Sequence, residues 1–257
     1  MKKIIDFIMN IIKLISDMLT KKDKESVNEV KNDSTDNVLG AITPKAPVYQ
    51  NVKILIDNGH GVNTGGKRSP YSFSGVEPKI PFLEYEWNRE IAKRIVDELL
   101  SEGFNAELIV TETIDISLSE RTNRVNLFCN EYGKSNVIFV SVHANAVGNG
   151  TKWMTAKGWC AYTTKGNTKS DTLSEYFYKE AEKNFEGRKI RTEMSDGDKD
   201  WESNFYVIHK TKCPAILTEN FFYDNVDDVT YILSDEGKRA VVKTHVDAII
   251  NYIKDTY

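Results

Sequence analysis

The sequence predicts an α/β domain of three layers, in which a mostly parallel mixed sheet is flanked by helices. Short apolar runs rich in β-branched residues alternate with segments of helical periodicity from about residue 51 onwards. The apolar runs lack the alternation of a half-exposed strand, which is typical of strands covered on both faces. With 257 residues and 40% hydrophobic composition, the chain is long enough for one such domain and an extension.

The first 50 residues are predicted to lie outside this domain. Residues 1–20 place apolar side chains at mostly helical spacing and charged side chains on the other face, which predicts an amphipathic helix. Its charges make it a poor transmembrane span or signal peptide, so we expect it to contact a membrane surface or a partner. Residues 21–50 are polar and include two prolines, which predicts a flexible linker before a catalytic domain at 51–257.

Composition argues against two classes of protein. The net charge is −4 and the folded portion has no block rich in Lys and Arg, so we expect no nucleic-acid binding. The three cysteines, Cys129, Cys160 and Cys213, are an odd number without a CxxC spacing. A disulfide framework or a thiolate zinc cluster is therefore excluded as the organising feature.

Local signals mark the helices of the domain. Trp87 and Ile91 begin an apolar series four residues apart, and Gly103 follows the end of that helix. Ser117 and Glu120 have the spacing of a capping box. The predicted order is a strand at 52–56, a loop at 61–82, a helix at 83–103, a strand at 106–110, a helix at 117–131, a strand at 136–145, a strand at 158–164, a helix at 171–185, a charged loop at 188–200, a short strand from 205, a third apolar strand at 214–222 and a last helix at 236–254.

Three apolar strands end in His60, His143 and Glu219. The carboxyl ends of parallel strands meet at one edge of a sheet, so these three side chains are expected to converge. Two imidazole nitrogens and a carboxylate are what a catalytic Zn²⁺ binds, with a fourth position open to water. A second carboxylate is then needed to take a proton from that water.

Three glutamates are candidates for the second carboxylate. Glu84 is favoured because it stands in the first turn of the helix that follows the long loop, and Glu86 and Glu77 are its rivals. Taken singly, each is typical of a solvated surface residue.

Two further residues have open roles. Asp57 precedes the first histidine, where it can orient His60 or only hydrogen-bond the strand end. His209, before the third strand, is expected either to contact substrate or to hydrogen-bond within its loop. His245 in the last helix is expected to be a partly buried packing residue.

Five motifs follow one another along residues 52–254. They are DNGHG at 57–61, Glu84 with Asn88 in LEYEWNREIAKRI, SLSERTNRVN at 117–126, SVHANA at 141–146 and PAILTENFF at 214–222. Together they resemble the zinc-dependent N-acetylmuramoyl-L-alanine amidases, and among these the phage-borne and related bacterial members. The sequence departs from many members at Asn58, where they have Pro, and at Asn220 and Phe221, where they have an aliphatic residue and Gly.

The resemblance implies a reaction and a set of residues. It implies that His60, Glu84 and His143 bind Zn²⁺ and that Glu219 is the general base. The bond cleaved would join the lactyl group of N-acetylmuramic acid to the L-alanine of the stem peptide in peptidoglycan. It also implies a cell-envelope or extracellular location, for a bacterial autolysin or for a phage endolysin released at lysis.

Three other functions agree with parts of the sequence. A zinc carboxypeptidase-like peptidase acting on wall peptides would use similar ligands, so the metal site alone does not separate it from an amidase. A non-catalytic peptidoglycan-binding module would not need both histidines and both glutamates. Residues 61–67 fit the GxxxxGK pattern of a phosphate-binding loop, but Arg68 stands where Ser or Thr is needed, and prolines prevent the following helix.

Overall fold

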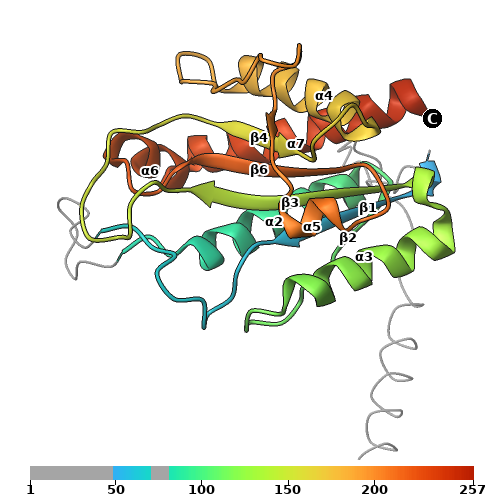
Figure 1. Cartoon of the computed structure of the whole chain (residues 1–257), viewed down its shortest axis with the longest axis horizontal. Helices are drawn as coiled ribbons and strands as arrows, with labels where there is room; N and C mark the ends of the chain where they lie inside the picture. Colours follow the sequence, from blue (N-terminus) through green and yellow to red (C-terminus); the bar gives the residue numbers. More distant parts are fainter. Residues whose placement is uncertain (1–48, 71–80) are drawn as a thin grey trace, which may run out of the picture. The chain divides into compact units, whose positions relative to one another are not determined.

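The computed structural model describes residues 49–70 and 81–257 and centres on one six-stranded sheet (Figure 1). The strand order is β2-β1-β3-β6-β4-β5, and β4 runs antiparallel to β6 while the other neighbours are parallel. The prediction of a mostly parallel mixed sheet is therefore confirmed. The strands are β1 (Tyr49–Asn58), β2 (Phe104–Leu108), β3 (Val137–Asn145), β4 (Cys160–Thr163), β5 (Trp201–Glu202) and β6 (Ala215–Phe222).

Helices cover both faces of the sheet, which confirms the three layers. On β1, Ile54 and Ile56 pack into one apolar cluster with α2, α4, α6 and α7, and Leu55 between them packs into a second cluster with α3 and α5. This explains the unbroken apolar runs, because alternate side chains serve opposite cores. The helices are α2 (Glu84–Ser101), α3 (Leu118–Tyr132), α4 (Lys169–Asn184), α5 (Tyr206–His209), α6 (Val226–Leu233) and α7 (Asp235–Thr256), with a 3₁₀ turn η1 at Lys134–Asn136.

The strand register brings the polar strand ends to one edge. Asp57 on β1 stands opposite Ser141 on β3, and His143 on β3 stands opposite Glu219 on β6. β1, β3 and β6 are neighbours in the sheet, so their carboxyl ends form a single surface. His60, two residues after β1, and Glu84, in the first turn of α2, lie beside His143 at this edge.

Several elements differ from the sequence predictions. The segment from 205, predicted as a short strand, is the short helix α5. Its two buried residues, Val207 and Ile208, are consecutive, and so short an apolar run is equally compatible with a helix and a strand. α6 and β5 were not predicted. The Asn225 side chain caps α6 by accepting hydrogen bonds from two backbone N–H groups of its first turn. β1 begins at Tyr49, within the segment predicted as linker.

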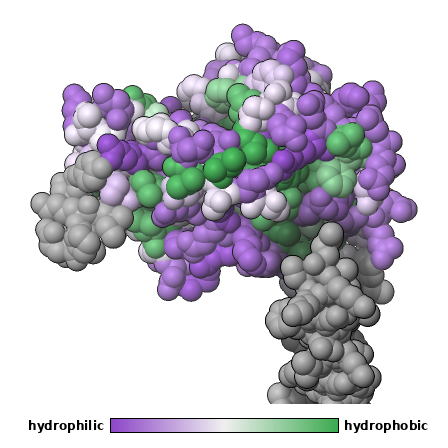
Figure 2. Space-filling model, turned by 90° about the horizontal axis from the view of Figure 1, so that it is seen from below, coloured by the Kyte–Doolittle hydropathy of each residue, from purple (hydrophilic) through white to green (hydrophobic). Residues whose placement is uncertain are grey.

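The surface of the described residues carries apolar side chains among hydrophilic ones. Figure 2 shows one face, on which the apolar residues form a broken band bordered by hydrophilic residues. Within the described ranges, no helix has the length and hydropathy to cross a membrane. The amphipathic helix predicted for residues 1–20, and most of the predicted linker, lie outside the described residues.

Candidate active site

The side chains of His60, Glu84 and His143 meet at the carboxyl edge of the sheet. Oε1 of Glu84 lies 3.3 Å from Nε2 of His60 and 3.1 Å from Nδ1 of His143. One ligand atom from each of the three residues lies within 4.8 Å of those of the other two. Of the rival glutamates, Glu86 is exposed and accepts a hydrogen bond from a neighbouring tyrosine, and Glu77 lies outside the described residues. The geometry therefore selects Glu84.

Glu84 is held in place by two neighbouring elements. Its Oε1 accepts hydrogen bonds from the backbone N–H of Ala144 at 3.3 Å and from Nδ2 of Asn88, one helical turn away, at 3.5 Å. The same Asn88 amide donates to the carbonyl of Gly59 at 3.2 Å, which ties α2 to the loop after β1. Oε2 of Glu84 is buried and has no hydrogen-bond partner among the described residues. A buried acceptor of this kind can serve as a metal ligand.

His60 has a backbone conformation that non-glycine residues seldom adopt. Its φ is 68°, in the left-handed region, where histidine is tolerated better than most side chains. Its carbonyl oxygen accepts hydrogen bonds from Nη1 of Arg89 at 2.9 Å and Nη2 of Arg121 at 3.4 Å. Two guanidinium groups thus fix the turn that presents the imidazole.

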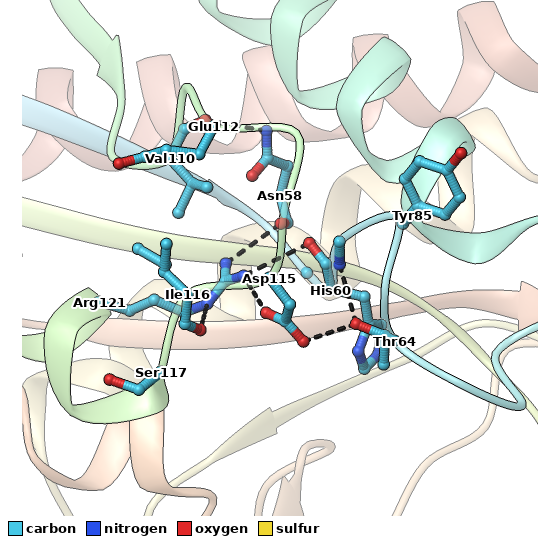
Figure 3. A network of polar contacts seen from close by, with 12 residues as sticks. Asn58, His60, Thr64, Tyr85, Val110, Glu112, Asp115, Ile116, Ser117 and Arg121 are labelled. Carbon is cyan, nitrogen blue, oxygen red and sulfur yellow. Dashed lines mark hydrogen bonds and ion pairs between the residues drawn. The ribbon is translucent and has the colours of Figure 1, made fainter.

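Arg121 is the centre of a polar network beneath this turn (Figure 3). Its guanidinium forms an ion pair with Asp57 and a second one, at 2.8 Å, with Asp115, and both Arg121 and Asp57 are buried. The other carboxylate oxygen of Asp57 accepts from Oγ of Ser141 at 2.7 Å. Asp57 therefore acts on the His60 loop through Arg121, and direct orientation of the imidazole stays a prediction.

Glu219 lies in the second half of β6, opposite His143 of the cluster. Its Oε2 is buried and lacks a hydrogen-bond partner within the described part of the chain. Burial raises the pKa of Glu219 to about 7, and the nearby charge of Glu84 acts in the same direction. A carboxyl group with a pKa near neutrality can both take and return a proton at physiological pH.

The charges of the cluster suit a metal ligand set. Burial alone would raise the pKa of Glu84, but its hydrogen bonds with His143 and His60 hold that pKa well below its usual value. Burial lowers the pKa of His60. For His143, burial lowers the pKa, and the hydrogen bond and charge of Glu84 outweigh this and raise it. Glu84 is therefore anionic and His60 favours the neutral form that binds metals, while the charge of Glu84 favours a proton on His143 that a bound cation would replace.

Two adjoining depressions open onto these residues. One of about 400 Å³ is lined by Glu84, His143 and Glu219 together with Tyr223, and the other, of about 240 Å³, by His60, His143 and Glu219. Lys67 lines both. A larger depression of about 880 Å³ lies between α2 and α7 and contains none of these residues. The smaller pair, where the polar groups converge, is the candidate substrate site.

His209 does not join the cluster. It is exposed at the end of α5 and lines a separate depression with Cys213 and Pro214, before the start of β6. The structure thus places it away from the site that the sequence suggested, and its contact with substrate stays a prediction.

Sequence reasoning missed the residues that support the ligands. Arg121 lies in the SLSERTNRVN motif and Asn220 in PAILTENFF, and the sequence alone does not predict what either side chain contacts. Nδ2 of Asn220 donates to the carbonyl of His143 at 2.9 Å, and its Oδ1 accepts from Nε1 of Trp159 at 3.0 Å. The sequence pattern that could have pointed to them is a polar residue within the apolar face of a helix, as at Arg121, or within an apolar strand, as at Asn220.

Comparison with known proteins identifies the family. The family model for N-acetylmuramoyl-L-alanine amidase matches residues 54–251. The chain is 29% identical over 201 residues to N-acetylmuramoyl-L-alanine amidase CwlM of Bacillus licheniformis, a match that covers 77% of this chain and 67% of that protein. It is 28% identical over 205 residues to the endolysin of Bacillus phage SPP1, covering 76% of this chain and 64% of the endolysin.

Solved structures show the same fold. An N-acetylmuramoyl-L-alanine amidase from Clostridium difficile 630 superimposes with a TM-score of 0.66 at 23% identity, covering 80% of this chain and 98% of that one. The amidase AmiC2 of Nostoc punctiforme gives a TM-score of 0.59 at 23% identity, covering 79% and 98%. The chain belongs to the N-acetylmuramoyl-L-alanine amidase family, a family of peptidoglycan hydrolases.

Proposed function

We propose that this amidase cleaves the amide between the lactyl group of N-acetylmuramic acid and the L-alanine of the stem peptide. In this proposal His60, Glu84 and His143 hold Zn²⁺, and Glu219 is the general base. The observation that carries it is the approach of three ligand atoms to within 4.8 Å of one another, beside Glu219, whose Oε2 is buried without a hydrogen-bond partner in the described residues.

The donor set fits zinc in number and kind. Two imidazole nitrogens and one carboxylate oxygen are the ligands of many catalytic zinc sites, which keep one position open. Asn88 and Ala144 hydrogen-bond Glu84, and such outer partners fix the direction of a ligand. When bound, Zn²⁺ supplies Lewis-acid activation of the amide carbonyl and of the attacking water.

Glu219 would move the proton. It takes a proton from the attacking water and returns it to the nitrogen of the departing L-alanine, so that one carboxylate acts first as base and then as acid. Burial raises its pKa, which favours uptake of the proton from the water. The backbone on either side is fixed in β6, and the next residue, Asn220, holds the carbonyl of His143.

The named relatives include a Bacillus amidase and a phage endolysin, which supports action on the cell wall, in the envelope or outside the cell. Whether the enzyme acts as an autolysin or as a phage endolysin depends on its source. Contact of residues 1–20 with a membrane surface stays a prediction.

Digestion of purified peptidoglycan tests the proposal. We expect new L-alanine amino termini, no new reducing sugar ends, and about one zinc ion per chain. A carboxypeptidase would instead release amino acids from the carboxyl end of the stem peptide. A binding module would release no product. New reducing ends, or full activity after the metal is removed, would sink the proposal.

Three variants separate the roles of the residues. Glu219→Gln should keep its zinc and lose activity by at least about 10²-fold. His143→Ala should lose both zinc and activity. Glu86→Gln, which changes an exposed carboxylate two residues from Glu84, serves as the matched control and should keep both.

A further inference from the structure

A second group of carboxylates lies apart from the active site. Asp171, Asp198 and Asp200 each offer one oxygen, and these oxygens lie within 4.8 Å of one another. Asp171 belongs to the first turn of α4, and the other two belong to the segment that leads into β5. The exposed fraction is 8% for Asp171 and 1% for Asp200. Buried carboxylates are rarely gathered in this way without a cation or protons between them.

Two of the six oxygens are buried and have no hydrogen-bond donor in the described residues. One oxygen of Asp171 accepts from the backbone N–H of Thr168 in a capping box, while its Oδ1 is buried and has no partner. Oδ1 of Asp198 is also buried and without a partner. The two oxygens of Asp200 accept from Oγ1 of Thr163 at 2.6 Å and Oγ of Ser174 at 2.9 Å. Asp171 and Asp198 thus each present a buried acceptor that the protein leaves open.

No basic side chain of the described residues compensates the three charges. Lys199, which stands between Asp198 and Asp200 in the sequence, directs its ammonium group to Glu182 instead. The three carboxyl groups therefore lie close together without a basic partner in the described residues, two of them buried and Asp198 half-buried.

We propose that Asp171, Asp198 and Asp200 form a binding site for Ca²⁺. All the donors are oxygens, which suit a hard cation rather than zinc. Asp171 and Asp198 each present one buried oxygen without a hydrogen-bond partner in the described residues, and Ca²⁺ accepts such oxygens in a flexible arrangement. Mg²⁺ requires shorter contacts and a stricter octahedral arrangement.

The position of the site suggests what the ion does. The hydroxyl of Thr163, at the end of β4, donates to Asp200, and the carbonyl of Thr163 accepts from the N–H of Ser203 at 2.9 Å. Two residues later, Phe205 packs edge-on against Tyr162, with 5.0 Å between ring centroids, and lines one active-site depression. The ion would therefore join α4, β4 and the segment that forms one wall of the substrate site.

Terbium luminescence and thermal unfolding test the proposal on the full chain with its catalytic metal in place. Tb³⁺ substitutes for Ca²⁺, and Trp201, the residue after Asp200, is a ready sensitiser. We expect sensitised emission that CaCl₂ displaces. At ten times its Kd, CaCl₂ should raise the Tm by about 2 to 5 °C, and MgCl₂ at the same concentration should raise it less.

Matched variants locate the site. Asp198→Asn should abolish both the emission and the calcium-dependent rise in Tm, and without calcium it should be at least as stable as the unchanged protein because a repulsive charge is gone. Asp196→Asn, which changes an exposed carboxylate of the same segment, should keep both responses. Absence of a calcium response in the folded protein, an equal response to MgCl₂, or an unchanged response in Asp198→Asn would overturn the assignment.

Discussion

The imidazole ring of His143 lies directly against Gly59, the residue before the other histidine of the site. A Cβ added to Gly59 would stand 2.0 Å from Cε1 of His143 and 2.4 Å from its Nε2. These distances are far below any van der Waals contact. The glycine of the DNGHG motif is thus required by the ring that packs on it.

We expect Gly59→Ala to displace His143 and weaken metal binding. Moving a reactive group by about 1 Å can cost about 10² in rate, so activity should fall by at least that factor. Zinc content after dialysis and the rate of peptidoglycan digestion measure the two effects. Gly65→Ala, where the added Cβ meets nothing within 4 Å, should keep its zinc. Equal zinc retention in both variants would show that His143 adapts.

Arg121→Met tests the buried ion pair beneath the His60 turn. Removing the guanidinium leaves Asp57 buried without its charge partner, which should cost about 3 to 5 kcal/mol in the free energy of unfolding. The exposed pair of Arg94 with Glu90 offers a control, and Arg94→Met should cost less than about 1 kcal/mol. Urea unfolding measures both. The double variant Asp57→Asn/Arg121→Met should recover part of the loss, because no uncompensated charge remains.

The fold was predictable to the extent that each element carried its own signal. The runs around Ile54 and Val140 are apolar without interruption because they serve two cores, and this pattern points to central strands. The segments that were missed are short. α5 and β5 are held by tertiary contacts, such as the packing of Phe205 on Tyr162, and their sequences alone favour no single structure.

The same contrast between local sequence signals and tertiary contacts applies to the candidate site. His60, His143 and Glu219 were predictable because each ends an apolar strand, and strand ends meet at one sheet edge. The partners that hold them were not, since the pairing of Arg121 with Asp57 spans 64 residues and depends on how α3 crosses the sheet. The spacing of residues along the sequence does not predict such contacts.

His245 should make the stability of the protein depend on pH. Its ring is fully buried, with Nε2 2.9 Å from Oγ1 of Thr218 and Nδ1 2.8 Å from the carbonyl of Val241. The sequence had suggested only partial burial. Burial lowers the pKa of His245 to about 4, so below its unfolded pKa of about 6.5 the unfolded chain binds a proton that the folded chain does not. Stability from this residue is complete above pH 6.5 and is lost as the pH falls towards 4.

Comparison with His245→Gln isolates this contribution. The difference in unfolding free energy between the unchanged protein and the variant should shrink by about 3 kcal/mol between pH 7 and pH 4. Chemical unfolding at a series of pH values measures it. Parallel pH profiles would mean that His245 takes up its proton with the same pKa in the folded and the unfolded chain.

Phe221 combines full burial with a backbone that favours glycine. Its φ is 68°, and its ring makes edge-on contacts with Phe185 and Tyr231 at centroid distances of 5.0 and 5.2 Å. Gly would adopt this left-handed backbone without strain. Here the packing of a large ring offsets a conformational cost of about 1 to 2 kcal/mol.

The two features can be separated by two substitutions at the same site. Phe221→Ala should cost about 3 to 5 kcal/mol through loss of the buried ring. Phe221→Gly should be no less stable than Phe221→Ala, because Gly adopts a positive φ without strain, and this reverses the usual order. At Phe222, which is buried in the same strand with a negative φ, Gly should be less stable than Ala by about 0.5 to 1 kcal/mol. Urea unfolding of the four variants at one pH gives both differences, and the same order of Gly and Ala at the two positions would show that the backbone at Phe221 stores no strain.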